Sequence, residues 1–193
     1  MTPAIVVTLV GLPARMLADF RARHAGQQVF AVGDLPECEV VYMLKENELF
    51  SITRAANAGI RAAIKAGHDP VIKTDIDCVL PPVEAWAGAA SGGRGAAFRY
   101  WEIKTATDTS AAKMCSRRCG TIVMTASDWQ RAGYYNEDMD GYGFDDGDMI
   151  DRARKAGIRI DLLRSPRVFH VSHAPHNRNT INPLKRKENM RKA

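Results

Sequence analysis

The chain has 193 residues, of which 46% are hydrophobic and 25% are charged, and both values are ordinary for a soluble globular protein. This length is enough for one good core but leaves little room for a second full domain. The longest apolar stretch near the start, residues 4–10, is too short to span a bilayer and has no basic segment before it, as a signal peptide would. The sequence therefore predicts no transmembrane segment and a cytoplasmic location.

The formal net charge of +5 is concentrated at the end of the chain. From residue 178 onward, six basic side chains (Arg178, Lys185, Arg186, Lys187, Arg191 and Lys192) face one acidic side chain, Glu188, which accounts for the whole excess. We predict one catalytic domain over residues 1–175 and a basic tail over residues 176–193. Such a tail can attract an anionic polymer or lipid, although more often it is solvated or contacts another subunit.

Apolar runs alternate with segments of helical periodicity along the first half of the chain. Apolar spacing over residues 12–24 predicts a helix that ends at Gly26, and Ile52, Ile60 and Ile64 lie on one stripe of a second helix. The predicted elements of this half are strands at 4–10, 29–32 and 40–44, helices at 12–24 and 50–66, and a strand that ends at Asp75.

The second half continues this alternation. Ser127 is expected to cap a short helix, with Gln130 at the reciprocal position of a capping box. Residues 104–118 have little periodicity, which predicts a mobile loop near the ligand. The other predicted elements are helices at 85–90 and 144–156 and strands at 96–100, 120–124, 158–163 and 167–171. The alternation predicts an α/β sandwich with a mixed, mostly parallel sheet flanked by helices, in which ligands gather at the carboxyl ends of strands.

Two carboxylates stand at the end of one predicted strand. Asp75 and Asp77 follow the apolar run Val71-Ile72 and precede Pro81-Pro82. Residues two apart on an extended chain point to the same side, so both carboxylates are expected to converge on one ligand. Carboxylate oxygens suit Mg²⁺ or Mn²⁺, which in turn bridge and neutralise a diphosphate. A solvated Asp-x-Asp turn is the alternative, because this spacing is common by chance.

A second acidic cluster opens the predicted helix at 144–156. Its members are Asp145, Asp146, Asp148 and Asp151. Acidic residues in a first turn stabilise the helix dipole, which explains part of the cluster by structure alone. The preceding Gly141-Tyr142-Gly143 lets the backbone approach a ligand and offers an aromatic face to a sugar. A carboxylate just beyond it is placed to take a proton from a hydroxyl, and an unperturbed Asp, with a pKa of about 3.9, is ionised at neutral pH.

Three histidines, His170, His173 and His176, follow one another at the end of the last predicted strand. A single histidine on a strand more often has a core or surface role. Imidazole is, however, a good further ligand for a cation such as Mn²⁺, so three histidines in seven residues favour one of them as a ligand.

In order and spacing, these motifs resemble the glycosyltransferase A fold, specifically the family-2-like enzymes and the catalytic part of the β-1,4-galactosyltransferases. The helix at residues 50–60 and the Asp75-Ile76-Asp77 motif are similar to the helix and Asp-x-Asp strand of these families. Residues 120–137 resemble their acceptor-side segment, and residues 141–148 resemble the Trp-Gly-Trp-Gly-Gly-Glu-Asp signature. The resemblance covers roughly residues 50–173.

The resemblance also implies roles for single residues. Asp77 would bind the metal, with His170 as the late ligand and His173 as its substitute, while Asp75 would lie near the nucleotide sugar and assist with the cation. The residues implied to face the substrates are Arg54 and Asn57 at the diphosphate, Tyr142 and Gly143 at the sugar, Asp145 orienting an acceptor hydroxyl, and Asp146 as the catalytic base. Two departures are that Asp145 replaces a glutamate and Phe144 replaces a glycine, which narrows the pocket floor.

The implied activity is an inverting, Mn²⁺- or Mg²⁺-dependent transfer of a sugar from a nucleoside-diphosphate sugar, with a UDP-sugar favoured. The acceptor hydroxyl would belong to a glycan or to a modified nucleic-acid base such as one in DNA. A nucleotidyltransferase is one alternative, but residues 10–15 match its Gly-rich, Arg-containing loop poorly. A non-catalytic carbohydrate-binding relative is another, and the two acidic clusters argue against it.

Overall fold

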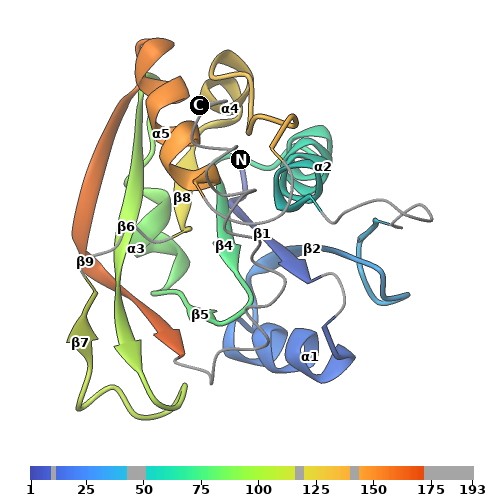
Figure 1. Ribbon diagram of the computed structural model, residues 1–193, viewed down its shortest axis with the longest axis vertical. Helices are drawn as coiled ribbons and strands as arrows, with labels where there is room; N and C mark the ends of the chain where they lie inside the picture. Colours follow the sequence, from blue (N-terminus) through green and yellow to red (C-terminus); the bar gives the residue numbers. More distant parts are fainter. Residues whose placement is uncertain (10–11, 43–50, 116–119, 140–143, 172–193) are drawn as a thin grey trace.

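The computed structural model describes residues 1–9, 12–42, 51–115, 120–139 and 144–171, and the remaining residues are drawn in grey in Figure 1. The strands are β1 (Ala4–Leu9), β2 (Gln28–Gly33), β3 (Val40–Val41), β4 (Val71–Asp75), β5 (Cys78–Val79), β6 (Arg94–Ile103), β7 (Lys113–Met114), β8 (Ile122–Met124) and β9 (Arg159–Val171). The helices are α1 (Ala14–Arg23), α2 (Ile52–Lys65), α3 (Val83–Ala87), α4 (Ala126–Arg131) and α5 (Asp145–Lys155).

The strands of the described residues form one sheet with a hydrophobic core on each face. Along β1, Ala4 and Val6 belong to one core, and Ile5 and Val7 belong to the other. Helices α2, α4 and α5 cover the first face, and α1 and α3 cover the second (Figure 1). The central strands are therefore apolar on both sides, as expected for strands buried between helices.

The sheet is mixed, with the strand order β3-β2-β1-β4-β8-β6-β9-β5 and β7 paired to β6. Strands β3, β2, β1 and β4 are parallel to one another, and β6 is parallel to β9. Strand β8 lies between β4 and β6 and is antiparallel to both, and β5 and β7 also pair in the antiparallel sense. The prediction of a mixed sheet flanked by helices is confirmed, but the parallel pairs do not outnumber the antiparallel ones because β8, β5 and β7 reverse direction.

The two late strands predicted at 158–163 and 167–171 are one strand, β9. Both parts pair with the same partner, β6, in the same parallel sense. The register shifts between them, because Phe98 lies opposite Leu163 whereas Tyr100 lies opposite Val168. Residues 164–167 of β9 therefore lie opposite a single residue of β6 and form a bulge. These mostly polar residues had suggested a break between two strands.

Other predicted boundaries need smaller corrections. Helix α4 is capped by Thr125, whose hydroxyl accepts a 3.2 Å hydrogen bond from the Asp128 N–H, and Ser127 lies inside the first turn. The predicted loop at 104–118 contains β7, and the strand predicted at 40–44 is the two-residue β3, with residues 43–44 outside the described ranges. In the part of the chain that is described, no helix is long and apolar enough to cross a membrane.

Candidate active site

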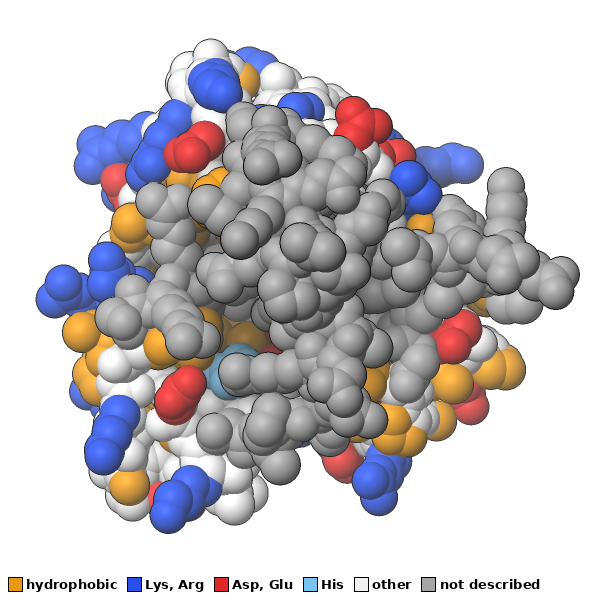
Figure 2. Space-filling view, viewed as in Figure 1, with side chains coloured by type: hydrophobic (Ala, Val, Ile, Leu, Met, Phe, Trp, Pro, Cys, Tyr) orange, Lys and Arg blue, Asp and Glu red, His pale blue; other side chains and the backbone are white. Residues whose placement is uncertain are grey.

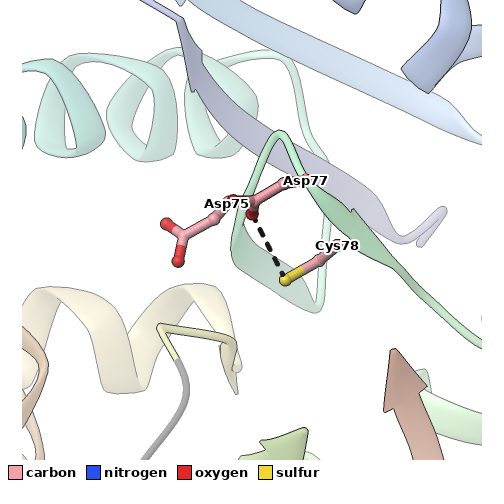
Figure 3. Close-up of side chains that lie close together, drawn as sticks. All are labelled: Asp75, Asp77 and Cys78. Carbon is pink, nitrogen blue, oxygen red and sulfur yellow. Dashed lines mark hydrogen bonds between the residues drawn. The ribbon is translucent and has the colours of Figure 1, made fainter. Parts of the chain in front are cut away.

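The carboxyl end of β4 carries the first acidic cluster. Asp75 is the last residue of β4, Ile76 and Asp77 form a turn, and Cys78 begins β5. Oxygen atoms of the two aspartates and the Cys78 sulfur lie within 4.8 Å of one another. Figure 3 shows the Cys78 thiol donating a 4.0 Å hydrogen bond to Asp77, while Asp75 points away from this pair. We expected Asp75 and Asp77 to converge because residues two apart on a strand point to the same side. In the structure a turn after β4 brings the two carboxylates together instead.

The pairing of β5 with β9 brings His170 to Asp77. Cys78 lies opposite His170 in this ladder, and the His170 Nε2 atom is 3.1 Å from Asp77 Oδ2. Burial lowers the pKa of His170, but the hydrogen bond and the negative charge of Asp77 outweigh burial and raise this pKa above its usual value. The Tyr100 ring stacks on the imidazole with centroids 4.7 Å apart, which fixes the ring plane. The structure thus brings these two predicted residues together, and their role as metal ligands stays a prediction.

The donor atoms of this cluster suit a divalent cation. Mn²⁺ binds both carboxylate oxygens, such as those of Asp77 and Asp75, and imidazole nitrogens, such as that of His170. Mg²⁺ prefers the carboxylate oxygens. A cavity of about 150 Å³ lies beside Asp77, between α1 and the turn, with Met16, Arg23 and Ile76 in its lining. The cluster is thus open on one side, as a site needs to be if the cation also holds a phosphate.

The second acidic cluster lies at the start of α5. Phe144 is its N-cap and has a positive φ of 76°, a conformation that glycine adopts more easily. Asp145 is 6% exposed, whereas Asp146 keeps 24% of its side-chain surface accessible. Asp146 is therefore the more accessible of these two carboxylates, as expected of a group that meets a substrate.

Lys73 joins the two acidic clusters. Side chains alternate along β4, so Lys73 and Asp75 both point toward the face covered by α2, α4 and α5. The Lys73 ammonium lies 3.0 Å from Asp75 Oδ1 and 3.7 Å from Asp146 Oδ1, and only 1% of its side chain is exposed. Burial lowers the pKa of Lys73, but the charges of the two aspartates outweigh this effect and raise it well above the usual value. The lysine is therefore charged at every physiological pH.

Burial raises the pKa of Asp146 to about 7, although the Lys73 charge acts in the opposite direction. The Tyr135 hydroxyl donates a 3.5 Å hydrogen bond to the same carboxylate. An ordinary, fully ionised aspartate was expected here, and the partial burial of this carboxylate beside Lys73 and Tyr135 accounts for the difference. A pKa near the working pH makes a carboxylate a better general base than an unperturbed aspartate.

The two substrate-binding residues predicted on α2 lie against the segment at residues 135–137. Asn57 is completely buried, with its Oδ1 accepting from Tyr135 N–H at 2.9 Å and its Nδ2 donating to Tyr135 O at 2.9 Å. The Arg54 Nε donates to Glu137 O at 3.3 Å. A diphosphate contact by Arg54 stays a prediction, and the burial of Asn57 favours a role in holding the 135–137 segment instead.

Four predictions lie outside the described residues. They concern Tyr142 and Gly143 at the sugar, His173 as a substitute metal ligand, and the basic tail at 176–193. They stay predictions from the sequence.

Sequence reasoning gave no role to three residues that the structure places at the site: Lys73, Gly120 and Tyr135. A Cβ atom at Gly120 would stand 2.7 Å from Asp75 Oδ2 and 3.0 Å from Asp146 Oδ2, so the absence of a side chain lets the two carboxylates approach. The role of Lys73 could have been suspected from the sequence, because a lysine stands in a predicted buried strand two residues before Asp75. Gly120 and Tyr135 gave no comparable signal, because their roles depend on tertiary contacts.

Residues 102–176 match a family model described as the N-terminal domain of galactosyltransferase. The match begins at the end of β6 and includes Asp145, Asp146 and His170. No curated protein matches the chain.

Solved structures match nearly the whole chain. The catalytic domain of Drosophila beta1,4-galactosyltransferase 7 in complex with xylobiose has a TM-score of 0.60 at 14% identity, covering 92% of this chain and 72% of that one. A mutant of that enzyme with manganese, UDP-Gal and xylobiose has a TM-score of 0.58 at 13% identity, covering 94% and 74%. The chain has the glycosyltransferase A fold.

A third structure, GalNAc-T7 with UDP, GalNAc and Mn²⁺, has a TM-score of 0.63 at 11% identity. The match covers 91% of this chain but 44% of GalNAc-T7, so the chain spans less than half of that protein. The shared fold and the segment that matches the galactosyltransferase model agree with the resemblance predicted from the motifs.

The face of the molecule seen in Figure 2 gives no support to binding of DNA or another anionic polymer by the described residues. In the face seen in Figure 2, the Lys and Arg side chains of the described residues stand around the rim with Asp and Glu between them. They form no continuous basic area there, and the structural relatives were solved with saccharides and nucleotides.

Proposed function

We propose that this domain is a metal-dependent, inverting glycosyltransferase that moves a sugar from a UDP-sugar to a saccharide hydroxyl. The observation that carries the proposal is that Asp77, after β4, lies beside His170 of β9 and close to Asp75, and that Lys73 links Asp75 to Asp146 on α5. The relatives support the choice of ligands, because they were solved with UDP-Gal, UDP, Mn²⁺ and saccharides.

Asp77, His170 and Asp75 would hold the cation. When bound, Mn²⁺ or Mg²⁺ supplies positive charge that stabilises the leaving diphosphate. The stacked Tyr100 ring holds the plane of the His170 imidazole, whose Nε2 faces Asp77, and the Cys78 thiol donates a hydrogen bond to Asp77.

Asp146 accepts the proton of the acceptor hydroxyl. As that O–H bond breaks, the oxygen forms a bond to the anomeric carbon, and the bond from this carbon to the diphosphate oxygen breaks with its electron pair. Attack from the side opposite to the leaving group inverts the anomeric configuration. Asp145, adjacent to Asp146 in the first turn of α5, would orient the acceptor hydroxyl.

The proposal is tested by calorimetric titration with UDP-glucose, UDP-galactose, UDP-N-acetylglucosamine and GDP-mannose, with and without Mn²⁺, alongside an assay for released nucleoside diphosphate. Xylobiose and N-acetylglucosamine serve as the first acceptor probes. Mn²⁺-dependent binding of one donor, with diphosphate release that an acceptor accelerates, is the expected result. Absence of binding to every donor in both conditions contradicts the proposal.

The same samples separate the alternatives. A nucleotidyltransferase releases pyrophosphate from a nucleoside triphosphate and a sugar phosphate, which the diphosphate assay does not register. A non-catalytic relative binds the saccharide and releases nothing.

A further inference from the structure

Lys73 is an unusual residue for its place in the fold. It lies in β4, a central strand with neighbours on both sides and a helical layer on each face, and only 1% of its side chain is exposed. Its ammonium is 3.0 Å from Asp75, 3.7 Å from Asp146 and 5.8 Å from the centroid of the Tyr135 ring. The lysine therefore contacts both acidic clusters and an aromatic face without reaching solvent.

A contribution to the stability of the fold does not explain why a lysine is buried at this position. Moving an ammonium out of water is costly, and replacing a buried ion pair by apolar side chains of similar volume is often neutral or stabilising. Val71, which lies on the same face of β4 two residues before Lys73, is apolar and completely buried, so this face accommodates an apolar residue. A charged residue at this place is therefore better explained by what it does to the two carboxylates.

Gly120 packs closely against Lys73, Asp75 and Asp146. Its backbone stands so close that an added Cβ atom would lie 2.7 Å from Asp75 Oδ2, 3.0 Å from Asp146 Oδ2 and 3.1 Å from Lys73 Nζ. The three charged groups thus meet in a space that a single methyl group would fill. Such a space holds the two carboxylates in one relative orientation.

We propose that Lys73 is a positioning residue, which orients the carboxylates of Asp75 and Asp146 toward each other and lowers the affinity of the neighbouring Asp77–His170 pair for a divalent cation. The inference deepens the proposed function, on which it rests. Orientation follows from the contacts of the ammonium with both carboxylates. The lower affinity follows because a fixed positive charge repels a cation and engages one oxygen of Asp75.

The direct test replaces Lys73 with methionine, which keeps the length of the side chain and removes its charge. Asp75 and Asp146 are 27% and 24% exposed, so water can reach the carboxylates that lose their partner, and the variant is expected to fold. Mn²⁺ binding is measured by electron paramagnetic resonance in the presence of UDP, and kcat and KM for the donor by diphosphate release. Lys65→Met, at an exposed position on α2, is the control.

The expected result is that Lys73→Met binds Mn²⁺ about tenfold more tightly, while kcat falls by about 100-fold because Asp146 is misplaced. A merely structural lysine would lower both quantities together. Mn²⁺ affinity and kcat that both stay within twofold of the wild type, or that both fall, overturn the inference.

If the wild type releases no diphosphate from any donor, the proposed function fails, and the Mn²⁺ titration alone decides the inference. Tighter Mn²⁺ binding by Lys73→Met then supports the inference, and unchanged, weaker or absent binding overturns it.

Gly120→Ala provides a second route if Lys73→Met does not fold. The added methyl group pushes the carboxylates of Asp75 and Asp146 apart and leaves the lysine charge in place, so kcat should fall by about 100-fold. Gly92→Ala is the matched control, because a Cβ atom there meets nothing within 4 Å. A Gly120→Ala variant with the wild-type kcat overturns the inference.

Discussion

Asp146 combines two properties that general-base catalysis requires: an accessible carboxylate and a pKa of about 7. In Asp146→Asn the amide cannot accept a proton, so kcat should fall by about 100- to 10,000-fold, the usual contribution of a general base. The affinity for UDP with Mn²⁺ should stay within a few-fold, because Asp77 and His170 are untouched. Steady-state kinetics and calorimetry measure the two quantities.

Asp151→Asn is the control for this substitution, since Asp151 lies on the exposed side of the same helix and pairs with Arg154. It should retain the wild-type kcat. Loss of donor affinity with normal turnover in Asp146→Asn would reject the assignment of the base.

Phe144 adopts a positive φ of 76° immediately before the catalytic helix. A left-handed conformation costs a residue with a Cβ atom about 1–2 kcal/mol, whereas glycine adopts it freely. Both Phe144→Ala and Phe144→Gly lose the aromatic ring, so comparing them isolates this backbone cost. We expect the glycine variant to be more stable than the alanine variant by about 1 kcal/mol in urea unfolding.

At a position with ordinary helical geometry, the alanine variant should instead be more stable than the glycine variant. At Asp151, within α5, alanine should be more stable than glycine by about 1 kcal/mol. A Phe144→Ala variant at least as stable as Phe144→Gly would show that the backbone at this position carries no strain.

At the scale of elements, the carboxyl-terminal end of α1 holds the segment that carries Asp77. Arg23 donates a 3.0 Å hydrogen bond to Ile76 O, and the backbone N–H of Leu80 donates at 3.1 Å to Nε2 of His24. The His24 Nδ1 lies 2.8 Å from Phe20 O, so Nδ1 carries the proton and the imidazole is neutral. The end of α1 and its C-cap thus hold the chain in the turn before β5, at Ile76, and just after β5, at Leu80.

This contact makes stability depend on pH. Burial lowers the pKa of His24 below its ordinary value of about 6.5. Below pH 6.5 the unfolded chain takes up a proton that the folded protein does not, so the free energy of unfolding falls as the pH falls, until the folded pKa is reached. The contribution amounts to at most about 1.4 kcal/mol per pH unit.

We therefore expect the wild type to lose more stability than His24→Gln between pH 7 and pH 5, measured by urea unfolding at each pH. The raised pKa of His170 contributes with the opposite sign, but it is common to both proteins and cancels in the comparison. Equal slopes in the wild type and His24→Gln would argue against a neutral His24 in the folded state.

Strand and helix periodicity located most of these elements, because burial on both faces of the sheet leaves apolar runs in the sequence. It failed at β9, where pairing with β6 continues across polar residues, and at the cap of α4, where Thr125 and Ser127 are both plausible caps. The acidic residues of the site were found from their spacing. The roles of Lys73 and Gly120 could not be found in this way, because they depend on β8 and α5 packing beside β4.

At the scale of the whole molecule, the proposed cation site joins β4 from the first half of the chain to β9 near its end. A ligand that binds this site stabilises only the folded state, by about 2.7 kcal/mol at 100 times its Kd, which corresponds to a rise in Tm of roughly 5–10 °C for a domain of this size. UDP with Mn²⁺ should produce this shift in a thermal melt. EDTA and the Asp77→Ala substitution should each abolish it.

Glu84→Ala, which removes an exposed carboxylate from α3, should keep the full shift. An unchanged shift in Asp77→Ala would place the cation elsewhere, because Asp77 and His170, 3.1 Å apart, form the proposed site.

The outer edge of β9 has a consequence for association between copies of the chain. Among the described residues, β9 spans 13 positions but pairs on its second side only with the two-residue β5. A long strand with an unpaired edge is a template for edge-to-edge aggregation. Arg159, Arg164, Pro166 and Arg167 lie along this strand, and charges and prolines prevent the docking of another strand. Replacing these residues with apolar ones would therefore produce inclusion bodies or fibres before it altered catalysis, since none of them belongs to the proposed site.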